Sequence, residues 1–597
     1  MPLQGSGQGS SPESANMERK LKKTCRVKVK HGKGLTMTKE MELLDLWLNN
    51  VKEEDLLAEL EAMRSDEKAA IEAFHKDLAF GTAGLRGIIG AGTDRMNVHT
   101  VGRATQGFAD YLNANFENPS VAIGRDSRIK GEEFVRRTAE VFAANGIKTY
   151  VYPRIEPTPC VSWAVRDLSC SGGVCMTASH NPAPYNGYKA YGPDGCQIAT
   201  EAADAISAAI ANVDTFKDVK ILDFDEAIEK GLVEWIEEAV LDRFIDAVEA
   251  CSVARPQDEG LPLKLVYTPL NGTGLECVSR ILERVGVTDV TVVPEQAEPD
   301  GNFPTCPYPN PEIREALQKG IDLCEEVHPD LLVATDPDAD RMGIAVKDGD
   351  DYLLLTGNET GVLLLDYCAR MVGDTQGAEA LKRKVAVTTI VSSVMVDAVA
   401  AEYGFEVRRV LTGFKYIGGI IGELEAEGEA DRYLFGFEES YGYLNGTHVR
   451  DKDAVDASML VCQMAQYYKA QGMNLADAMR ALYEKHGYFL NKTLSFSFPG
   501  VEGGERMAAL MKGLREEPPA AFAGCAVEGC IDYATGVNGL PAANVVEFDL
   551  EGGNKVIFRP SGTEPKVKAY LFSKRETREA AEQLLADLEA EVSEFMK

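Results

Sequence analysis

The chain has 597 residues, 45% hydrophobic and 26% charged, which is the composition of a soluble globular protein and the length of three or four domains. Its formal net charge of −32 at pH 7 argues against nucleic acid as the main partner, although a single site can still be basic. No run of eighteen apolar residues predicts a membrane span, and 13 cysteines without a C-x-x-C pair predict neither a disulfide framework nor a zinc site. We therefore expect a reduced cytoplasmic protein without a membrane partner.

The first 36 residues differ from the rest of the chain. Residues 1–16 are poor in apolar side chains, and residues 19–33 carry eight Lys and Arg but lack the apolar core of a signal peptide. Two interpretations stay open: a disordered basic extension able to bind RNA, and a true start at Met37. The fold predicted below concerns only the residues that follow this segment.

The next part of the chain alternates helical and strand patterns. Helical periodicity covers residues 42–76 and is followed by a glycine-rich loop at residues 80–90. The sequence then predicts, in order, a strand, a helix, a strand, a helix and a strand at residues 120–124, 131–146, 147–153, 158–168 and 172–177.

The same order of elements recurs twice, in residues 263–335 and in residues 384–437. Alternating strands and helices predict mostly parallel sheets with helices on both faces, and such sheets bind ligands at the carboxyl ends of their strands. A last segment from about Leu490 has a helix at each end around several strands, which predicts a smaller α+β domain. The fold class is thus α/β, with three similar mixed α/β domains in series and a smaller C-terminal domain.

The first distinctive loop reads TASHNP and contains Ser179 and His180, directly after the strand predicted at residues 172–177. Ser179 can be a turn or capping serine, which is the commonest use of serine. It can also be a nucleophile held on a tight loop at the end of a strand. The serine by itself does not decide between the two.

The second loop reads DPDADR and places Asp336, Asp338 and Asp340 at alternating positions. Three carboxylates facing one point repel one another unless a cation neutralises them, and hard oxygen ligands of this number suit Mg²⁺. An EF-hand is excluded because its sixth and twelfth positions are Arg341 and Lys347. A solvated acidic turn is the other alternative.

Two further loops offer groups for a phosphate and for a sugar. RPSGTEP holds Arg559, Ser561, Gly562 and Thr563, a pattern that suits a phosphate but also an ordinary turn. GFEESYG offers Glu438 and Ser440, which suit sugar hydroxyls or a solvated loop equally well. Together the four loops indicate phosphoryl transfer on a sugar phosphate. The chain has no Walker A motif or dinucleotide fingerprint, so an ATP-dependent kinase is not supported.

The four motifs occur in the order found in the α-D-phosphohexomutase superfamily, which the sequence resembles from about Glu40 to its end. FGTAGLRG, NPAPYNGYKAYGPDG and GFEESYGY are most similar to its phosphoglucomutase/phosphopentomutase branch, including bacterial phospho-sugar mutases. The resemblance implies four domains around a central cleft. The expected divisions are an extension at 1–36 and domains at 37–225, 226–348, 349–488 and 489–597.

The resemblance also implies roles for individual residues. Ser179 would carry the phosphate, and Mg²⁺ would be held by an oxygen of phosphorylated Ser179 with Asp336, Asp338 and Asp340. Arg86 and Lys189 would assist proton transfer, with His180 and Arg341 beside them. Glu438 and Ser440 would bind sugar hydroxyls. The non-transferring phosphate would be held by Arg559, Ser561, Gly562 and Thr563.

The implied reaction interconverts glucose 1-phosphate and glucose 6-phosphate through glucose 1,6-bisphosphate, in a monomer or weak dimer. Mannose or pentose phosphates as substrates, and synthesis of a bisphosphate from a foreign donor, are alternatives within the same chemistry. An Asp-nucleophile phosphatase with Asp336 and Asp338 as the acting pair, and a non-catalytic sugar-phosphate sensor, are alternatives of other classes.

Overall fold

The computed structural model describes residues 38–81, 84–255, 257–258, 261–498, 500–561 and 566–596. The expected extension at 1–36, Gly562 and Thr563 lie outside these residues. Within them, four sheets follow one another along the chain. None of the described helices is both long enough and apolar enough to cross a membrane.

The first sheet has the strand order β1-β5-β4-β2-β3-β6. Three of the described helices precede it, and helices pack on both of its faces. Its elements are α2 (Lys39–Asn50), α3 (Glu54–Met63), α4 (Glu67–Phe74), β1 (Leu85–Ile88), α5 (Val98–Asn115), β2 (Ser120–Arg125), α6 (Gly131–Ala144), β3 (Lys148–Val151), α7 (Thr158–Asp167), β4 (Gly172–Met176), β5 (Tyr185–Tyr191), α8 (Thr200–Ala211), α9 (Phe224–Glu229) and β6 (Val233–Trp235).

The second sheet has the order β11-β10-β9-β7-β8 and the third the order β13-β12-β14-β15. The elements of the second are α10 (Glu238–Glu249), β7 (Lys264–Thr268), α11 (Gly274–Arg284), β8 (Asp289–Val292), α12 (Pro294–Ala297), α13 (Arg314–Val327), β9 (Leu331–Thr335), β10 (Met342–Asp348) and β11 (Asp351–Leu355). Those of the third are α14 (Gly357–Gln376), α15 (Ala378–Leu381), β12 (Val385–Thr389), α16 (Met395–Tyr403), β13 (Glu406–Val410), α17 (Phe414–Ala426), the 3₁₀ turn η1 (Ala430–Arg432), β14 (Tyr433–Glu438), β15 (Gly442–Leu444), α18 (Ala454–Lys469) and α19 (Leu475–His486).

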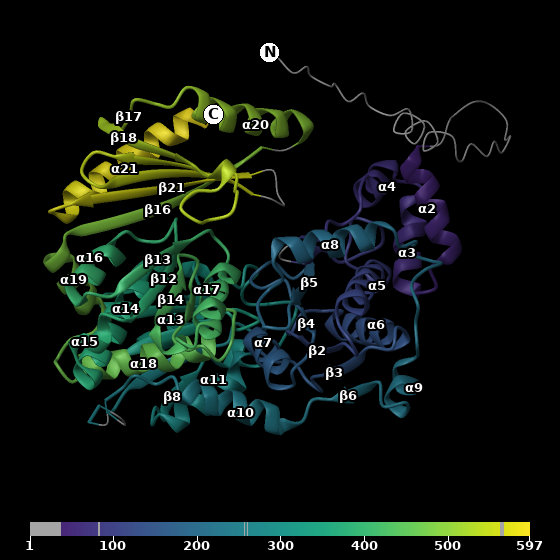
Figure 1. Cartoon of the computed structure of the whole chain (residues 1–597), viewed down its shortest axis with the longest axis horizontal. Helices are drawn as coiled ribbons and strands as arrows, with labels where there is room; N and C mark the ends of the chain where they lie inside the picture. The colour runs from purple at the N-terminus through teal and green to yellow at the C-terminus, as the bar shows by residue number, and fades with distance from the viewer. Residues whose placement is uncertain are drawn as a thin grey trace, which may run out of the picture.

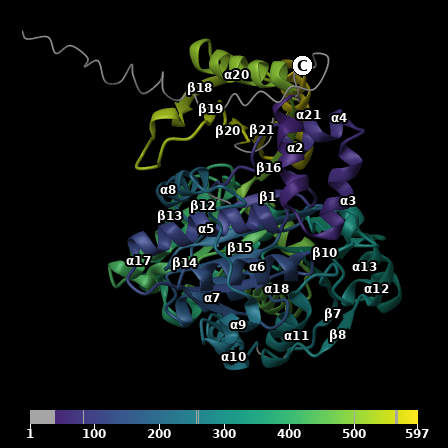
Figure 2. The ribbon, with the colours of Figure 1, turned by 90° about the vertical axis from the view of Figure 1, so that its right-hand side faces the viewer.

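The fourth sheet is antiparallel, with the order β16-β21-β20-β19-β18-β17. Its elements are β16 (Tyr488–Ser497), α20 (Gly500–Glu516), β17 (Ala521–Phe522), β18 (Cys525–Asp532), the 3₁₀ turn η2 (Tyr533–Thr535), β19 (Val546–Leu550), β20 (Asn554–Pro560), β21 (Lys566–Arg575) and α21 (Arg578–Phe595). In both views α20 lies on the side of this sheet away from the rest of the chain (Figure 1, Figure 2).

The three α/β domains share one local arrangement that positions the predicted loops. The strand before each loop pairs antiparallel with the strand after it: β4 with β5, β9 with β10, and β14 with β15. Parallel pairings, which the sequence predicts, are the majority in these sheets taken together, and the sheets are mixed because in each one the chain turns back directly after the loop. Each of the TASHNP, DPDADR and GFEESYG loops is consequently anchored by a strand at both ends.

Strand pairing also gives a physical basis for dividing the chain. β6 pairs with β3 in the first sheet, and β11 pairs with β10 in the second. Both strands lie beyond the domain ends expected at residues 225 and 348. We therefore propose that the first domain ends after Trp235 and the second after Leu355.

Helix α18 joins the second and third domains. All residues from Ala454 to Tyr468 are buried, which is the pattern of a helix surrounded by protein on every side. Its apolar side chains belong to one large core cluster with α11 of the second domain and α14 of the third. The residues just before α18 are therefore fixed relative to both domains.

The fourth domain contacts the third at two places: at β16, where Phe489 joins the large core cluster, and through a smaller separate cluster on one face of its sheet. Side chains alternate along its strands, so Val556 and Phe558 face α20 and α21, whereas Ile557 faces the other way. On that second face Ile557, Tyr570 and Phe572 pack with residues of the third domain, among them Leu411. The chain enters the fourth domain at Gly487, whose φ of +95° is favourable for glycine.

Candidate active site

Ser179 lies in the turn between β4 and β5, with its side chain directed at the second domain. Its hydroxyl donates to Asp336 Oδ2 at 2.8 Å and lies 3.2 Å from His180 Nδ1. Its backbone has a φ of +52°, in the left-handed region that costs a non-glycine residue energy, and its N–H donates to Thr177 Oγ1 at 2.8 Å. The surrounding structure thus holds a strained serine against a carboxylate from another domain.

Arg128 holds the loop in this conformation. Its guanidinium is buried and donates to the carbonyl oxygens of Ser179, Asn181, Pro182 and Tyr185. Its Nε lies 3.2 Å from Asp126 Oδ2, so the buried charge is paired. The sequence analysis did not single out Arg128. The only signal was an Arg following Asp126 and Ser127 in GRDSRIKG, a pattern common in ordinary turns.

The three predicted carboxylates do converge. Asp336, Asp338 and Asp340 are buried, and one oxygen of each lies within 4.8 Å of the others. Asp336 Oδ1 accepts the backbone N–H groups of Asp340 and Arg341 at 3.1 and 3.0 Å, so the loop folds around its first aspartate. DPDADR is therefore a compact charged turn inside the protein, and the alternative of a solvated acidic turn is excluded.

Two lysines from different domains compensate part of this charge. Lys189 Nζ on β5 lies 2.6 Å from Asp338 Oδ2 and 2.7 Å from Asp340 Oδ2. Lys452 Nζ, just before α18, lies 2.9 Å from Asp340 Oδ2. The sequence analysis predicted Lys189 but missed Lys452. Its only signal was the D-K-D pattern ahead of a helix, which reads as N-capping by Asp453.

The pKa values of the carboxyl groups show that the compensation is incomplete. Burial would raise the pKa of Asp338, but the attraction of Lys189 outweighs burial and holds it below its usual range. Burial and the charges of Asp338 and Asp340 raise the pKa of Asp336 well above its usual range. The Oδ1 atoms of Asp338 and Asp340 have no hydrogen-bond donor among the described residues. Together with Ser179 Oγ, these oxygens form a donor set that fits a hard divalent cation.

Beside the carboxylates, a cavity of about 470 Å³ opens between all four domains. Its lining includes most of the predicted site residues: Arg86, Ser179, His180, Lys189, Asp340, Arg341, Glu438, Ser440 and Arg559. A larger cavity of about 740 Å³ lies next to it between α8 and α17, but its lining holds none of the predicted residues. The smaller cavity is therefore the candidate active site.

The walls of this cavity carry several cations. Arg86 on β1 is exposed there and donates to Asn181 Oδ1 at 3.4 Å, while Arg341 donates to Glu312 Oε1 at 2.8 Å. Burial, with Arg341 and Arg86 nearby, lowers the pKa of His180 well below its usual range, so the imidazole is neutral at pH 7. The positive charge that faces the cavity therefore comes from the arginines and lysines rather than from His180.

The acidic wall comes from the third domain. Glu438 is buried at the end of β14 and accepts the backbone N–H of Gly413 at 2.7 Å. Burial and the neighbouring Glu439 raise the pKa of Glu438 to about 7, against the attraction of Lys452 and Arg341. Ser440 follows in the turn to β15 and lines the cavity. A carboxylate next to a hydroxyl suits a ligand that offers several hydroxyl groups.

The fourth domain contributes a basic wall. Arg559 on β20 donates to Tyr570 OH at 3.1 Å, and Lys568 on β21 lines the cavity beside it. Lys568 was not predicted, since it lies after the RPSGTEP motif on a strand. Ser561 ends the β20 side of the loop, where its backbone N–H donates to Lys566 O at 2.8 Å. Among the described residues the cavity lining includes Arg559 but not Ser561, and the predicted Gly562 and Thr563 lie outside the described residues.

Comparison with known proteins assigns these domains to a family. Models of domains I, II and III of phosphoglucomutase/phosphomannomutase, each described as α/β/α, match residues 77–217, 242–349 and 356–486. A phosphoglucomutase from Staphylococcus haemolyticus is 36% identical over 513 residues, which cover 84% of this chain and 91% of that protein. A phosphoglucomutase from Staphylococcus aureus strain USA300 is 34% identical over 558 residues, 91% of this chain and 97% of that protein.

Solved structures share the fold. A phosphoglucomutase/phosphomannomutase family protein from Burkholderia thailandensis superposes with a TM-score of 0.64 at 18% identity, over 87% of this chain and 98% of its own. The phosphoglucomutase parafusin from Paramecium, in an open form, has a TM-score of 0.64 at 19% identity, over 87% and 94% of the two chains. At these identities the likeness concerns the fold alone.

We expect Arg128→Lys to loosen the Ser179 loop without unfolding the domain. Lysine keeps the charge opposite Asp126, but it cannot donate to four separate carbonyl groups. Backbone amides of residues 179–185 should exchange hydrogen about tenfold faster or more, which corresponds to the loss of roughly 1.4 kcal/mol of local stability. Hydrogen exchange read by mass spectrometry measures this directly. Arg136→Lys, at an exposed position on α6, is the matched control, and equal exchange in the two variants would contradict the assignment.

Proposed function

Because the chain belongs to the phosphoglucomutase/phosphomannomutase family and is a phospho-sugar mutase, we propose that it interconverts glucose 1-phosphate and glucose 6-phosphate through a phosphorylated Ser179. The observation that carries the proposal is the contact between Ser179 Oγ and Asp336, inside a cavity lined by the predicted residues of all four domains. The relatives named phosphoglucomutase match most of the chain, and they support glucose as the sugar.

The first half of the reaction passes the phosphoryl group from Ser179 to the sugar. A sugar hydroxyl attacks phosphorus while the bond between phosphorus and Ser179 Oγ breaks, and the hydroxyl proton ends on Ser179 Oγ. Lys189 and Arg86 lie beside the serine, where they neutralise the developing charge and assist the proton transfer. The product of this step is glucose 1,6-bisphosphate.

The second half returns the other phosphate to Ser179 after the bisphosphate has turned over in the cavity. Arg559 has to bind whichever phosphate is not reacting, which a planar guanidinium can do irrespective of the sugar carbon. We propose that Ser561, Gly562 and Thr563 complete this clamp. Glu438 and Ser440 hold the sugar hydroxyls, and the neutral His180 and the cationic Arg341 flank the reacting phosphate.

A divalent cation belongs to the proposed site. Asp336, Asp338 and Asp340 would hold Mg²⁺ with an oxygen of phosphorylated Ser179, since the three carboxylates converge and two of their oxygens accept no hydrogen bond from the described residues. When bound, the ion supplies charge neutralisation at the phosphoryl oxygens. The chain itself keeps the three carboxylates together and supplies Lys189 and Lys452 as fixed counter-charges.

The central test is Ser179→Ala. Removing the phosphoryl carrier should lower the mutase activity by thousands-fold or more, as deletion of a covalent nucleophile does in other enzymes. Wild-type protein incubated with ³²P-labelled glucose 1,6-bisphosphate should carry the label on the peptide that contains Ser179. Ser171→Ala, just before β4, is the control and should keep both label and activity. Label on an aspartyl residue of DPDADR would support the phosphatase alternative instead.

A comparison of substrates tests which sugar the enzyme prefers, independently of the role of Ser179. Glucose, mannose, ribose and glucosamine 1-phosphates should be assayed with a trace of the matching bisphosphate. We expect the highest kcat/KM for glucose 1-phosphate. A higher kcat/KM for ribose 1-phosphate or mannose 1-phosphate would make that sugar phosphate the preferred substrate and would leave the proposed role of Ser179 unaffected.

Asp338→Asn tests the cation. The substitution removes one negative charge at nearly constant volume, so the variant should fold while its activity falls by two orders of magnitude or more. EDTA should abolish wild-type activity, and Mg²⁺ should restore it. Asp348→Asn, an exposed position at the end of β10, should behave as wild type. A wild-type enzyme that is indifferent to EDTA would contradict the assignment of a metal to DPDADR.

The raised pKa of Glu438 predicts a pH dependence. Its carboxyl group, with a pKa of about 7, must be ionised to accept sugar hydroxyls, so kcat/KM should fall as the pH drops below 7. The substrate phosphate also gains a proton near pH 6. Glu438→Gln should therefore retain only the lower-pH decrease, at a reduced plateau. Identical pH profiles for the variant and the wild type would show that Glu438 does not titrate in the reaction.

A further inference from the structure

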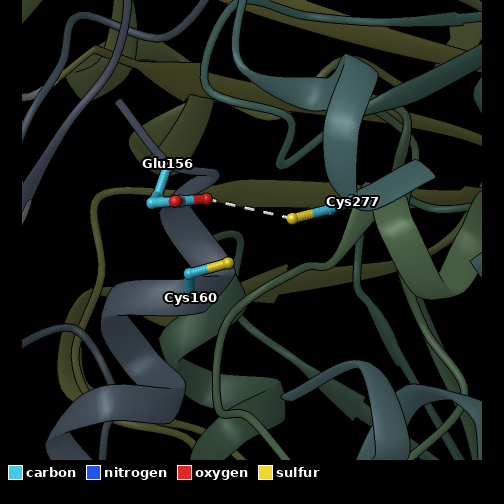
Figure 3. Close-up of side chains that lie close together, drawn as sticks. All are labelled: Glu156, Cys160 and Cys277. Atoms are coloured by element: carbon cyan, nitrogen blue, oxygen red, sulfur yellow. Dashed lines mark hydrogen bonds between the residues drawn. The ribbon is translucent and has the colours of Figure 1, made fainter. Parts of the chain in front are cut away.

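A second cluster of ligating side chains lies at the junction of the first and second domains. Cys160 is on α7, Cys277 is on α11, and Glu156 lies in the segment before α7. All three are buried, and one donor atom of each lies within 4.8 Å of the other two. Figure 3 shows the three side chains pointing toward one another, with 3.9 Å between Cys277 Sγ and Glu156 Oε2.

The donor set selects a class of cation. Two sulfurs and one carboxylate oxygen suit a borderline or soft ion of the zinc class, whereas Mg²⁺ requires oxygen ligands. Zinc–sulfur bonds are about 2.3 Å long, so two thiolates on one tetrahedral ion lie about 3.8 Å apart. The donor atoms already lie within 4.8 Å of one another, and an inward movement of about 1 Å or less brings them to that separation.

The charges around the cluster also favour a cation. Arg154 is the positive partner of Glu156, at 2.9 Å, but it is shared with Glu238 and Glu276. Burial and the charges of Glu276 and Glu238 raise the pKa of Glu156 to about 7, despite Arg154. Burial also raises the pKa of the Cys160 thiol. A divalent ion would replace the protons on these groups and supply the missing positive charge.

The cluster is connected to the candidate active site through both of its domains. Thr158, between Glu156 and Cys160, donates its backbone N–H to Asp338 O at 2.8 Å and its hydroxyl to Asp338 Oδ2 at 2.7 Å. Thr273, just before α11, donates its backbone N–H to Pro337 O at 2.9 Å. The two segments that carry the cysteines therefore also hold the DPDADR loop.

We propose that Glu156, Cys160 and Cys277 form a binding site for a zinc-class divalent cation, separate from the aspartate site. Drawing the two cysteines together on one ion shifts Thr158 and Thr273, and this shift displaces Asp338. Occupancy of the site thus lowers mutase turnover. This second part rests on the function proposed above, whereas binding of the cation does not.

Cd²⁺ is the probe, because its bonds to thiolates give an ultraviolet charge-transfer absorption that carboxylate ligands do not give. The full-length chain would be produced in medium supplemented with Cd²⁺, so that the ion is present while the buried site forms, and purified in excess Mg²⁺. We expect one tightly held Cd²⁺ per chain by native mass spectrometry, together with the thiolate absorption. The double variant C160A/C277A should lose both signals.

Two further variants separate ligation from general effects of thiol removal. Cys462→Ala removes a buried thiol of α18 that lies outside the cluster, and it should keep the bound Cd²⁺ and the absorption. Glu156→Gln keeps both thiols and the side-chain volume and should weaken Cd²⁺ binding about tenfold or more. Each variant is compared by its thermal midpoint and by its activity with Mg²⁺ alone, which C160A/C277A should retain.

The outcomes are distinct. A wild-type chain without the thiolate absorption, or an absorption of equal strength in C160A/C277A, overturns the site. A Cd²⁺-loaded wild type should turn over at least several-fold more slowly than Cd²⁺-treated C160A/C277A under saturating Mg²⁺. Equal rates would overturn the coupling to Asp338. If the chain lacked mutase activity altogether, the metal content and the absorption would still decide whether the site exists.

Discussion

The mutual repulsion of three buried carboxylates is the constraint on which the rest of the site depends. Asp336, Asp338 and Asp340 occupy one turn of the second domain, where water cannot screen them. Their compensation comes from Lys189 of the first domain and Lys452 of the third. Charge neutralisation therefore requires the three domains to stand in one arrangement, and the same arrangement creates the cavity beside the carboxylates.

Neutral contacts fix the positions of these charges. Helix α18 is buried on all sides and places Lys452 just before its start, while the β4–β5 hairpin places Ser179 in its turn and Lys189 on its second strand. Arg128 donates hydrogen bonds to backbone carbonyl groups of that turn and so fixes its conformation. The site side chains thus stand on short loops held at both ends by strands, or beside helices, whose packing is independent of any ligand, which is the arrangement expected for a site that stabilises charge without reorganising.

The sequence predicts a site well where one short segment contains all the side chains that the site needs. DPDADR predicts a cation site because its three carboxylates are adjacent in the chain, and RPSGTEP predicts a phosphate site on Arg559 for a similar reason. Lys452 and Arg128 could not be found in this way, because each acts on a segment from which it is distant in sequence, and Lys568 was missed because it lies on the strand that follows the RPSGTEP motif. Lys452 lies more than a hundred residues from the aspartates it neutralises, and its neighbours resemble a helix cap.

Among the strands, too, some could be predicted from the sequence and others could not. Buried strands such as β2, β4 and β9 read as short apolar runs, whereas β5, with the sequence YNGYKAY, contains polar residues and a glycine that conceal its period. The return strands β5, β10 and β15, which add antiparallel pairings to the expected parallel ones, were not predicted. Each follows directly on a polar loop, and β5 also carries Lys189 to the site, whereas the side chains of β10 and β15 pack mainly in the core.

The attachment of the fourth domain has a mechanical consequence. One stretch of backbone through Gly487 links it to the others, and an apolar cluster that includes Ile557 and Leu411 forms a second contact with the third domain. Close to the link, the side chain of Asn358 on α14 donates to Asn491 Oδ1 on β16 at 2.8 Å, whereas the apolar side chains of the second contact impose no fixed direction on their neighbours. Arg559 lies two residues from Ile557 on the same strand. Any displacement of the fourth domain relative to the third would therefore move this basic wall with respect to the cavity walls that the other three domains supply.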